Sequence, residues 1–151
     1  GLELETTCEA PTSLKFSYKP AMERVATYTD VLNAINNNDC AIIDNRSREE
    51  FMGVDQRARF GGAIPSAKHR DWEELYDHHS GCMKPADELQ LAFGSLGADQ
   101  HKEIILYCNT GYRSAHAYLA LRLLDYPRVR NYIGSWQEWG NREGLPIKEG
   151  R

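Results

Sequence analysis

The sequence predicts an α/β fold, with a mostly parallel central sheet of about five strands and helices on both faces. Two short segments, 40–43 and 104–107, are apolar from end to end, which is typical of strands buried on both faces of a sheet. Helix-like and strand-like segments alternate along the chain, as parallel strands joined by crossover helices require. At 151 residues, the chain has the length of one ordinary domain.

The first predicted helix begins at Thr27 or Thr29, because either side chain can cap it. It ends in the asparagine-rich segment 36–39, directly before the strand 40–43. The apolar face expected on this helix consists of Val31, Leu32 and Ile35.

A short helix is predicted after this strand, with Ser47 as its cap and Glu50 as the partner in a capping box. The segment 61–67 contains two glycines and a proline, which favour a tight loop leading into another brief strand. Asp71 can cap a further short helical segment over residues 72–76.

In the second half of the chain, a helix opens near Pro85 and ends at Gly97. A long helix follows the second apolar strand and is broken before Pro127. The last strand covers residues 129–132, and a closing helix begins at Gly134. The expected apolar faces are Leu89, Leu91, Ala92 and Leu96 on the first of these helices, and Ala117, Leu119, Ala120, Leu123 and Leu124 on the second.

Residues 1–24 carry no periodic apolar face, so we interpret them as an N-terminal arm or an extension like an interdomain linker, and residues 25–151 as the domain.

A net charge of −4 argues against general electrostatic binding to nucleic acid, and no apolar run is long enough to span a membrane. The cysteines show no CxxC spacing, which favours separate thiols in a reducing, cytoplasmic compartment. They are Cys8, Cys40, Cys82 and Cys108.

The strongest functional signal is the loop that follows the strand 104–107. It consists of Cys108, Asn109, Thr110, Gly111, Tyr112, Arg113 and Ser114. Ligands collect at the carboxyl ends of parallel strands. Loop amides and a helix N-terminus can lower a cysteine pKa from ~8.5 to roughly 3.5–7.5. Arg113 adds a cation, and Ser114 can cap the next helix or donate its hydroxyl, so we predict that Cys108 is a thiolate nucleophile at neutral pH.

This loop resembles the active-site loop of the rhodanese sulfurtransferases, and three further motifs match that family in the same order. Residues 44–46 (Asp-Asn-Arg) resemble its Asp-x-Arg, residues 62–67 its Gly-His-Ile-Pro-Gly-Ala loop, and residues 132–139 its closing tryptophan-containing segment. The resemblance covers most of residues 25–148 and is closest to the second, catalytic domain of tandem thiosulfate and 3-mercaptopyruvate sulfurtransferases.

The resemblance implies a rhodanese-like fold and a sulfurtransferase. Cys108 is then expected to accept a sulfane sulfur from thiosulfate or a related small anionic donor, and to hold it as a persulfide. It passes the sulfur to cyanide or a cellular thiol, and the cycle needs no metal and no organic cofactor. The remaining loop residues bind the donor, with Asp44 and Arg46 as possible support. Residues 1–24 resemble a tandem linker, which implies a first rhodanese domain as partner if the chain is a fragment.

The chain departs from the family pattern at four positions. Ala63 replaces the histidine of the Ile-Pro loop, and Ser66 replaces a glycine there. Thiosulfate sulfurtransferases place a lysine where this chain has Thr110, and an arginine where it has Glu50. The loop also differs from the Gly-Ser-Gly-Val type of the mercaptopyruvate branch. We therefore expect weak binding of thiosulfate itself.

Two alternative functions stay open. A cysteine phosphatase of the same fold needs a Cys-x5-Arg loop, whereas Cys108 and Arg113 are spaced as Cys-x4-Arg, and Ser114 stands where the phosphatase arginine would be. A regulatory or binding rhodanese module typically lacks the cysteine. A metal site at His78, His79 and Cys82 is less favoured than a solvated loop.

Overall fold

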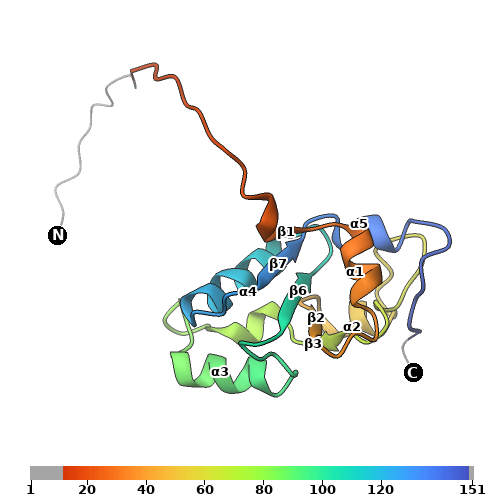
Figure 1. Cartoon of the computed structure of the whole chain (residues 1–151). Coiled ribbons are helices and arrows are strands. Elements are labelled where there is room, and N and C mark those ends of the chain that lie inside the picture. Colours follow the sequence, from red (N-terminus) through yellow and green to blue (C-terminus); the bar gives the residue numbers. More distant parts are fainter. Residues whose placement is uncertain (1–11, 150–151) are drawn as a thin grey trace.

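The computed structural model describes residues 12–149 and contains a five-stranded sheet whose neighbouring strands are all parallel (Figure 1). The order across the sheet is β1-β7-β6-β2-β3. The α/β prediction is thereby confirmed. The strands are β1 (Val25–Ala26), β2 (Cys40–Asp44), β3 (Lys68–His69), β6 (Glu103–Tyr107) and β7 (Val129–Tyr132).

Helices cover both faces of this sheet (Figure 1). Alternate residues of the central strands point to opposite faces, so Ile104 and Leu106 enter one core while Ile105 and Tyr107 enter the other. The helical segments are η1 (Met22–Arg24), α1 (Tyr28–Ala34), α2 (Arg48–Phe51), η2 (Trp72–Leu75), α3 (Ala86–Gly94), α4 (Tyr112–Leu123) and α5 (Ser135–Trp139).

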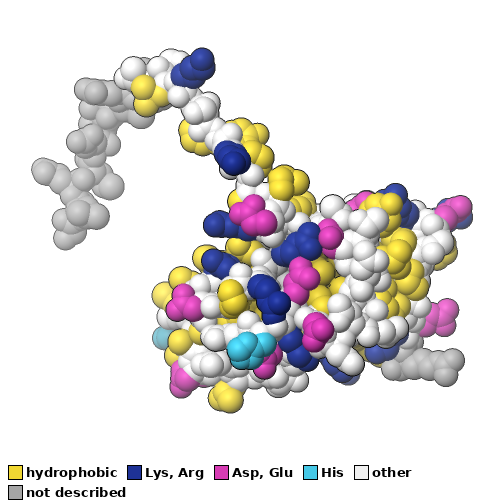
Figure 2. Space-filling view, in the orientation of Figure 1, with side chains coloured by type: hydrophobic (Ala, Val, Ile, Leu, Met, Phe, Trp, Pro, Cys, Tyr) yellow, Lys and Arg dark blue, Asp and Glu magenta, His cyan; other side chains and the backbone are white. Residues whose placement is uncertain are grey.

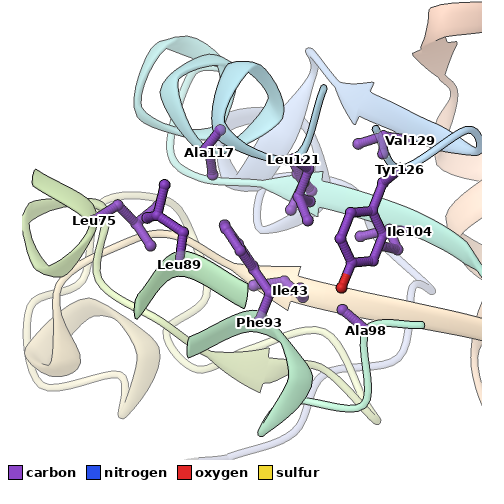
Figure 3. Close-up of a cluster of buried hydrophobic side chains, with 12 residues drawn as sticks. Ile43, Leu75, Leu89, Phe93, Ala98, Ile104, Ala117, Leu121, Tyr126 and Val129 are labelled. Carbon is purple, nitrogen blue, oxygen red and sulfur yellow. The ribbon is translucent and has the colours of Figure 1, made fainter. Parts of the chain in front are cut away.

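The core on one face lies between the sheet and helices α3 and α4 (Figure 3). Phe93 of α3 and Leu121 of α4 are completely buried in it, together with Ile43 and Ile104 from the two central strands. Leu75 of η2 joins the same cluster. This packing fixes α4, which begins at the candidate loop, against the sheet.

The core on the other face is built around two tryptophans of α5. Trp136 and Trp139 are completely buried in the same cluster as Ile105 and Tyr107. Each indole N–H donates to a backbone carbonyl, so neither ring leaves a buried donor unpaired. The buried tryptophans anchor α5 beside the ends of the central strands.

The register of the two central strands brings the candidate residues to one edge. Ile42 pairs with Ile105, and Asp44 pairs with Tyr107, so β2 and β6 end at the same level. The Asn45 amide then donates to the Tyr107 carbonyl at 2.8 Å. Cys108 therefore leaves the sheet directly beside the segment that follows β2.

The predicted helix starts are confirmed. Thr27 caps α1 and forms a capping box with Asp30. Ser47 caps α2 and forms one with Glu50, as the sequence indicates. Asp71 accepts a hydrogen bond from the Glu73 amide at the start of η2.

Parts of the predicted apolar faces were wrong. Four leucines expected in the core are between 41% and 75% exposed: Leu32, Leu91, Leu119 and Leu123. Successive residues on a helix point about 100° apart, so only part of an apolar run can face the sheet. Val31 rather than Leu32 is buried on α1, and Ile35 lies just beyond the end of that helix. Phe93, which the prediction omitted, is buried on α3.

Short elements and helix ends also differ from the prediction. Helix α3 ends at Gly94, one turn before the expected stop at Gly97. The strands β1, β4 (Tyr76–Asp77) and β5 (Cys82–Met83) were not predicted. Each contains two residues, which is too few to show an alternating pattern. Strands β4 and β5 form an antiparallel hairpin outside the main sheet.

Residues 12–20 contain neither helix nor strand and extend away from the domain (Figure 1). Figure 2 shows hydrophobic side chains along this segment, and Leu14, Phe16 and Tyr18 are each more than 75% exposed. The boundary between arm and domain at residues 24 and 25 stays a prediction, and Cys8 lies outside the described residues. No helix within 12–149 is long and apolar enough to cross a membrane.

A buried ion pair lies at the end of β2. The Arg46 guanidinium donates to the Asp44 carboxylate at 2.6 Å, and both side chains are at most 1% exposed. The same guanidinium donates to the Gly62 carbonyl and lies 4.3 Å from the ring centroid of Trp136. The Arg46 guanidinium thus connects β2, the 61–67 loop and α5.

We expect Asp44→Asn to lower the free energy of unfolding by about 3 kcal/mol, because removing one partner leaves the Arg46 charge buried without a counter-ion. The chain contains a matched control with the same Asp-x-Arg spacing, the exposed pair of Asp55 and Arg57. Asp55→Asn should change stability by less than about 0.5 kcal/mol. Urea unfolding of both variants checks this, and equal losses would contradict it.

Candidate active site

Cys108 lies at the carboxyl end of β6, and its side chain is almost completely buried. Only residues 108–111 separate the strand from α4, because the helix already begins at Tyr112. Gly111 occupies the N-cap position, so of the two roles predicted for Ser114 the structure shows donation of the hydroxyl into the loop and not the helix cap. Ser114 instead lies in the first turn of α4, with its side chain buried beside the thiol.

Hydrogen bonds converge on the sulfur of Cys108. The Gly111 amide donates to Sγ at 3.1 Å, and the Ser114 hydroxyl lies 3.5 Å from Sγ. Burial raises the pKa of Cys108, but the Ser114 hydroxyl and the amides of Ser114, Thr110 and Gly111 outweigh it. The pKa of Cys108 is therefore lower than that of an ordinary cysteine, which favours the thiolate.

Gly111 allows the loop to close around the sulfur. Its φ is +88°, a left-handed conformation that glycine adopts without strain. A Cβ atom at this position would lie 3.1 Å from the Ile133 carbonyl oxygen and 3.2 Å from the Ile133 Cα. Both the turn and the close approach to the segment after β7 therefore require glycine.

The start of α5 holds the backbone of the loop. The Cys108 amide donates to Ser135 Oγ at 3.1 Å, and the Trp136 amide donates to the Cys108 carbonyl at 2.9 Å. The Gln137 amide donates to the Asn109 carbonyl at 2.9 Å. Ser135 itself has a φ of +51°, which is a strained backbone conformation for a serine. This conformation places its hydroxyl where the Cys108 amide donates to it. Sequence reasoning matched this segment to the family pattern but gave Ser135 no role.

Asn131 of β7 is a second residue that sequence reasoning missed. Its side-chain oxygen accepts from the Ser114 hydroxyl at 2.7 Å, in competition with Cys108 Sγ for the one hydroxyl proton, and its amide group donates to the Gly111 carbonyl at 3.1 Å. It therefore connects the two groups that bond to the Cys108 sulfur. The only feature of the sequence that points to Asn131 is that a polar asparagine lies within the predicted strand 129–132.

Arg113 does not point freely into the site. Its guanidinium forms two hydrogen bonds with the Glu50 carboxylate, at 2.6 and 2.9 Å. The hydrogen bonds that Arg113 donates to the Glu50 carboxylate raise the pKa of Arg113. Burial raises the pKa of Glu50, but Arg113 and the Ser47 amide outweigh burial and the pKa is lowered. Both side chains are thus charged at neutral pH, and the cation expected beside Cys108 is neutralised.

The other predicted site residues fall into two groups. Asp44 and Arg46 are paired with each other and buried, so they support the sheet edge and do not reach the surface beside the thiol. Asn109 is partly buried, with a side-chain oxygen that accepts no hydrogen bond within the described chain. Thr110 and Tyr112 are exposed, and Tyr112 is 83% exposed at the mouth of the loop.

A cysteine with a lowered pKa, held by loop amides at the carboxyl edge of a parallel sheet, is typical of α/β proteins that use a cysteine nucleophile. The Rhodanese-like domain family matches residues 27–142. The chain belongs to this family.

Three curated relatives illustrate the range of the similarity. The chain is 36% identical to a putative thiosulfate sulfurtransferase of Haloferax volcanii, over 96% of this chain and 54% of that protein. It is 34% identical to the thiosulfate sulfurtransferase of Azotobacter vinelandii, over 97% and 52%. It is 40% identical to the 3-mercaptopyruvate sulfurtransferase of Escherichia coli K12, over 83% and 45%. The chain spans about half the length of these relatives.

Solved structures show the same fold. A structure of EanB, in a persulfide form with ergothioneine, superposes with a TM-score of 0.79 and 25% identity. The superposition covers 85% of this chain and 33% of that one. The ergothioneine biosynthesis enzyme of Chlorobium limicola also has a TM-score of 0.79, at 24% identity, over 85% and 32%.

We expect Ser114→Ala to raise the pKa of Cys108, because the variant removes the side-chain hydrogen bond that favours the thiolate. A bond worth about 1 kcal/mol corresponds to a thiolate fraction that is about fivefold lower below the pKa. The rate of iodoacetamide alkylation of Cys108 against pH measures the change. Thr110→Ala is the control, because Thr110 acts through its backbone amide. A profile that moves equally in both variants would contradict the role of the Ser114 hydroxyl.

Proposed function

We propose that this chain is a sulfurtransferase whose Cys108 thiolate takes a sulfane sulfur from thiosulfate or a related donor and holds it as a persulfide. Cys108 then passes the sulfur to cyanide or a cellular thiol. The observation that carries the proposal is the position of Cys108 Sγ, buried within hydrogen bonds from Gly111 and Ser114. The names of the relatives, thiosulfate and 3-mercaptopyruvate sulfurtransferases, support it.

In the first step, the Cys108 thiolate attacks the outer sulfur of thiosulfate. A new S–S bond forms at Cys108, the S–S bond of thiosulfate breaks, and sulfite leaves with the bonding electron pair. The persulfide anion keeps the single negative charge that the thiolate carried. The Gly111, Thr110 and Ser114 amides that favour the thiolate are also placed to stabilise this anion.

In the second step, cyanide attacks the terminal sulfur of the persulfide. The S–S bond breaks, thiocyanate leaves, and the Cys108 thiolate is restored. A cellular thiolate can attack in the same way and become a persulfide itself. Each step is a nucleophilic displacement at sulfur, so the cycle requires neither a metal nor an organic cofactor.

The proposed partners follow from the chemistry and from chain length. The donor is a small anionic sulfur compound, and the acceptor is cyanide or a thiol. Because the relatives are about twice as long, we include a first rhodanese domain as a partner within a longer protein. A thiolate and persulfide cycle operates in a reducing compartment, for which the cytoplasm is our proposal.

We expect Cys108→Ser to abolish transfer of sulfur from thiosulfate to cyanide, because serine stays protonated at neutral pH while filling nearly the same volume. Thiocyanate formation measures turnover. Intact-mass spectrometry should show one added sulfur after treatment of the unmodified protein with thiosulfate, and cyanide should remove it. Cys82→Ser is the matched control, because Cys82 is exposed and lies on the β4-β5 hairpin. Undiminished turnover in the Cys108 variant would remove Cys108 from the mechanism.

The length of the loop predicts that the chain does not hydrolyse aryl phosphates. Four residues between Cys108 and Arg113 leave a cradle for a sulfur-sized anion, and Arg113 is held by Glu50. Inserting a glycine between Tyr112 and Arg113 should sharply reduce sulfur transfer, because it displaces the Ser114 amide and hydroxyl from Sγ. Release of p-nitrophenol from its phosphate by the unmodified chain, and its loss in Cys108→Ser, would favour the phosphatase alternative.

A further inference from the structure

The negative charge of Glu50 compensates the positive charge of Arg113, the cation in the loop that begins at Cys108. Its carboxylate lies against both terminal nitrogens of Arg113, in the two-pronged geometry that gives strong ion pairs. The side chain of Glu50 is only 3% exposed, and its carboxylate also accepts the Ser47 amide at the start of α2. The pairing is therefore part of the packed structure and differs from a fluctuating surface contact.

The other arginines whose charges act on Glu50 are paired as well. Arg46 is held by Asp44, and Arg57 is held by Asp55. The negative charge of the Cys108 thiolate acts on Arg113, so the charge state of that pair is felt at the sulfur. A further carboxylate, Asp71, also acts on Arg113.

The exposed side chains at and beside the loop are apolar or uncharged. Tyr112 is 83% exposed and Ile133, which contacts Gly111, is 53% exposed. Thr110 is exposed and uncharged. The thiolate is thus stabilised by amide and hydroxyl dipoles, while the nearby arginines are each paired with a carboxylate and Asp71 adds one further negative charge.

A free cation stabilises a bound dianion such as thiosulfate more than it stabilises a monoanion. A neutral ion pair stabilises either anion only slightly. We propose that Glu50 sets the charge class of the sulfur donor: by neutralising Arg113, it makes Cys108 favour donors with at most one negative charge over dianionic thiosulfate. This inference rests on the proposed function, since it concerns the donor of the same site. A persulfide R–S–SH belongs to the favoured class. The Cys108 thiolate attacks its outer sulfur, the donor S–S bond breaks, and R–S⁻ leaves while Cys108–S–SH forms.

The test compares two donors that transfer the same kind of sulfur but differ by one charge, thiosulfate and methanethiosulfonate. Glu50→Gln keeps an oxygen for the capping box of α2 and removes the negative charge that compensates Arg113. One released positive charge near the site should raise kcat/KM by about threefold for each negative charge on the donor. The gain is then about tenfold for thiosulfate and about threefold for methanethiosulfonate, and it should shrink as salt is added.

Two further variants separate charge from structure. Glu49→Gln changes a neighbouring exposed carboxylate of α2 and should leave the ratio of the two kcat/KM values unchanged. The double variant Glu50→Gln with Arg113→Gln removes both charges, so its donor ratio should return to that of the unmodified chain. A ratio that is the same in Glu50→Gln and in the unmodified chain overturns the proposal, as does a double variant that keeps the ratio of Glu50→Gln.

A second measurement does not depend on sulfur transfer. Iodoacetate and iodoacetamide alkylate the same thiolate, but only iodoacetate is negatively charged, so their rate ratio at Cys108 reports the local charge. The ratio should rise about threefold in Glu50→Gln and stay constant in Glu49→Gln. If neither donor loads Cys108 while this ratio rises as expected, the proposed function fails and the effect of Glu50 stands. If both donors load Cys108 and neither ratio changes, the inference about Glu50 fails alone.

Discussion

The structure depends on one constraint: Cys108 must be buried and still favour a negative charge. Burial alone raises the pKa of a thiol, because the thiolate loses its solvation. The chain meets this constraint with dipoles, from the amides of the loop and the hydroxyl of Ser114. Such dipoles act only at short range, so their positions must be fixed within a few tenths of an ångström. The fixed geometry of the loop is therefore what the surrounding fold has to supply.

The parallel sheet supplies that geometry from both sides of β6. On one side, β7 contributes Asn131, and the turn after it contributes Ser135 and the close contact with Gly111. On the other side, the segment after β2 bonds to the end of β6 through the Asn45 amide. The buried Arg46 pair connects this side to α5. A central strand is needed for this arrangement, since an edge strand has a neighbour on one side only.

Much of this could be predicted from local sequence patterns. The apolar strands, the caps at Thr27 and Ser47, and the position of Cys108 after a buried strand depend on residues close together in the chain. The missed features depend on residues far apart. Arg113 and Glu50 are separated by 63 positions, and Cys108 and Ser135 by 27. The capping box predicted one role of Glu50 correctly, but nothing local indicates that its carboxylate also holds an arginine.

In the proposed function, the same distinction separates the groups that stabilise the thiolate at short range from the charge that favours one class of donor over another. Dipoles from the loop favour any anion at the sulfur position, so they act on the thiolate and on a persulfide in the same way. A net charge acts over a longer distance and therefore distinguishes donors by how much charge they carry. In this chain the dipoles belong to residues 108–114, while the net charge is set by Glu50 on another helix. Glu50 makes no hydrogen bond to Cys108, so our proposal places the choice of donor on a residue outside the hydrogen bonds that favour the thiolate.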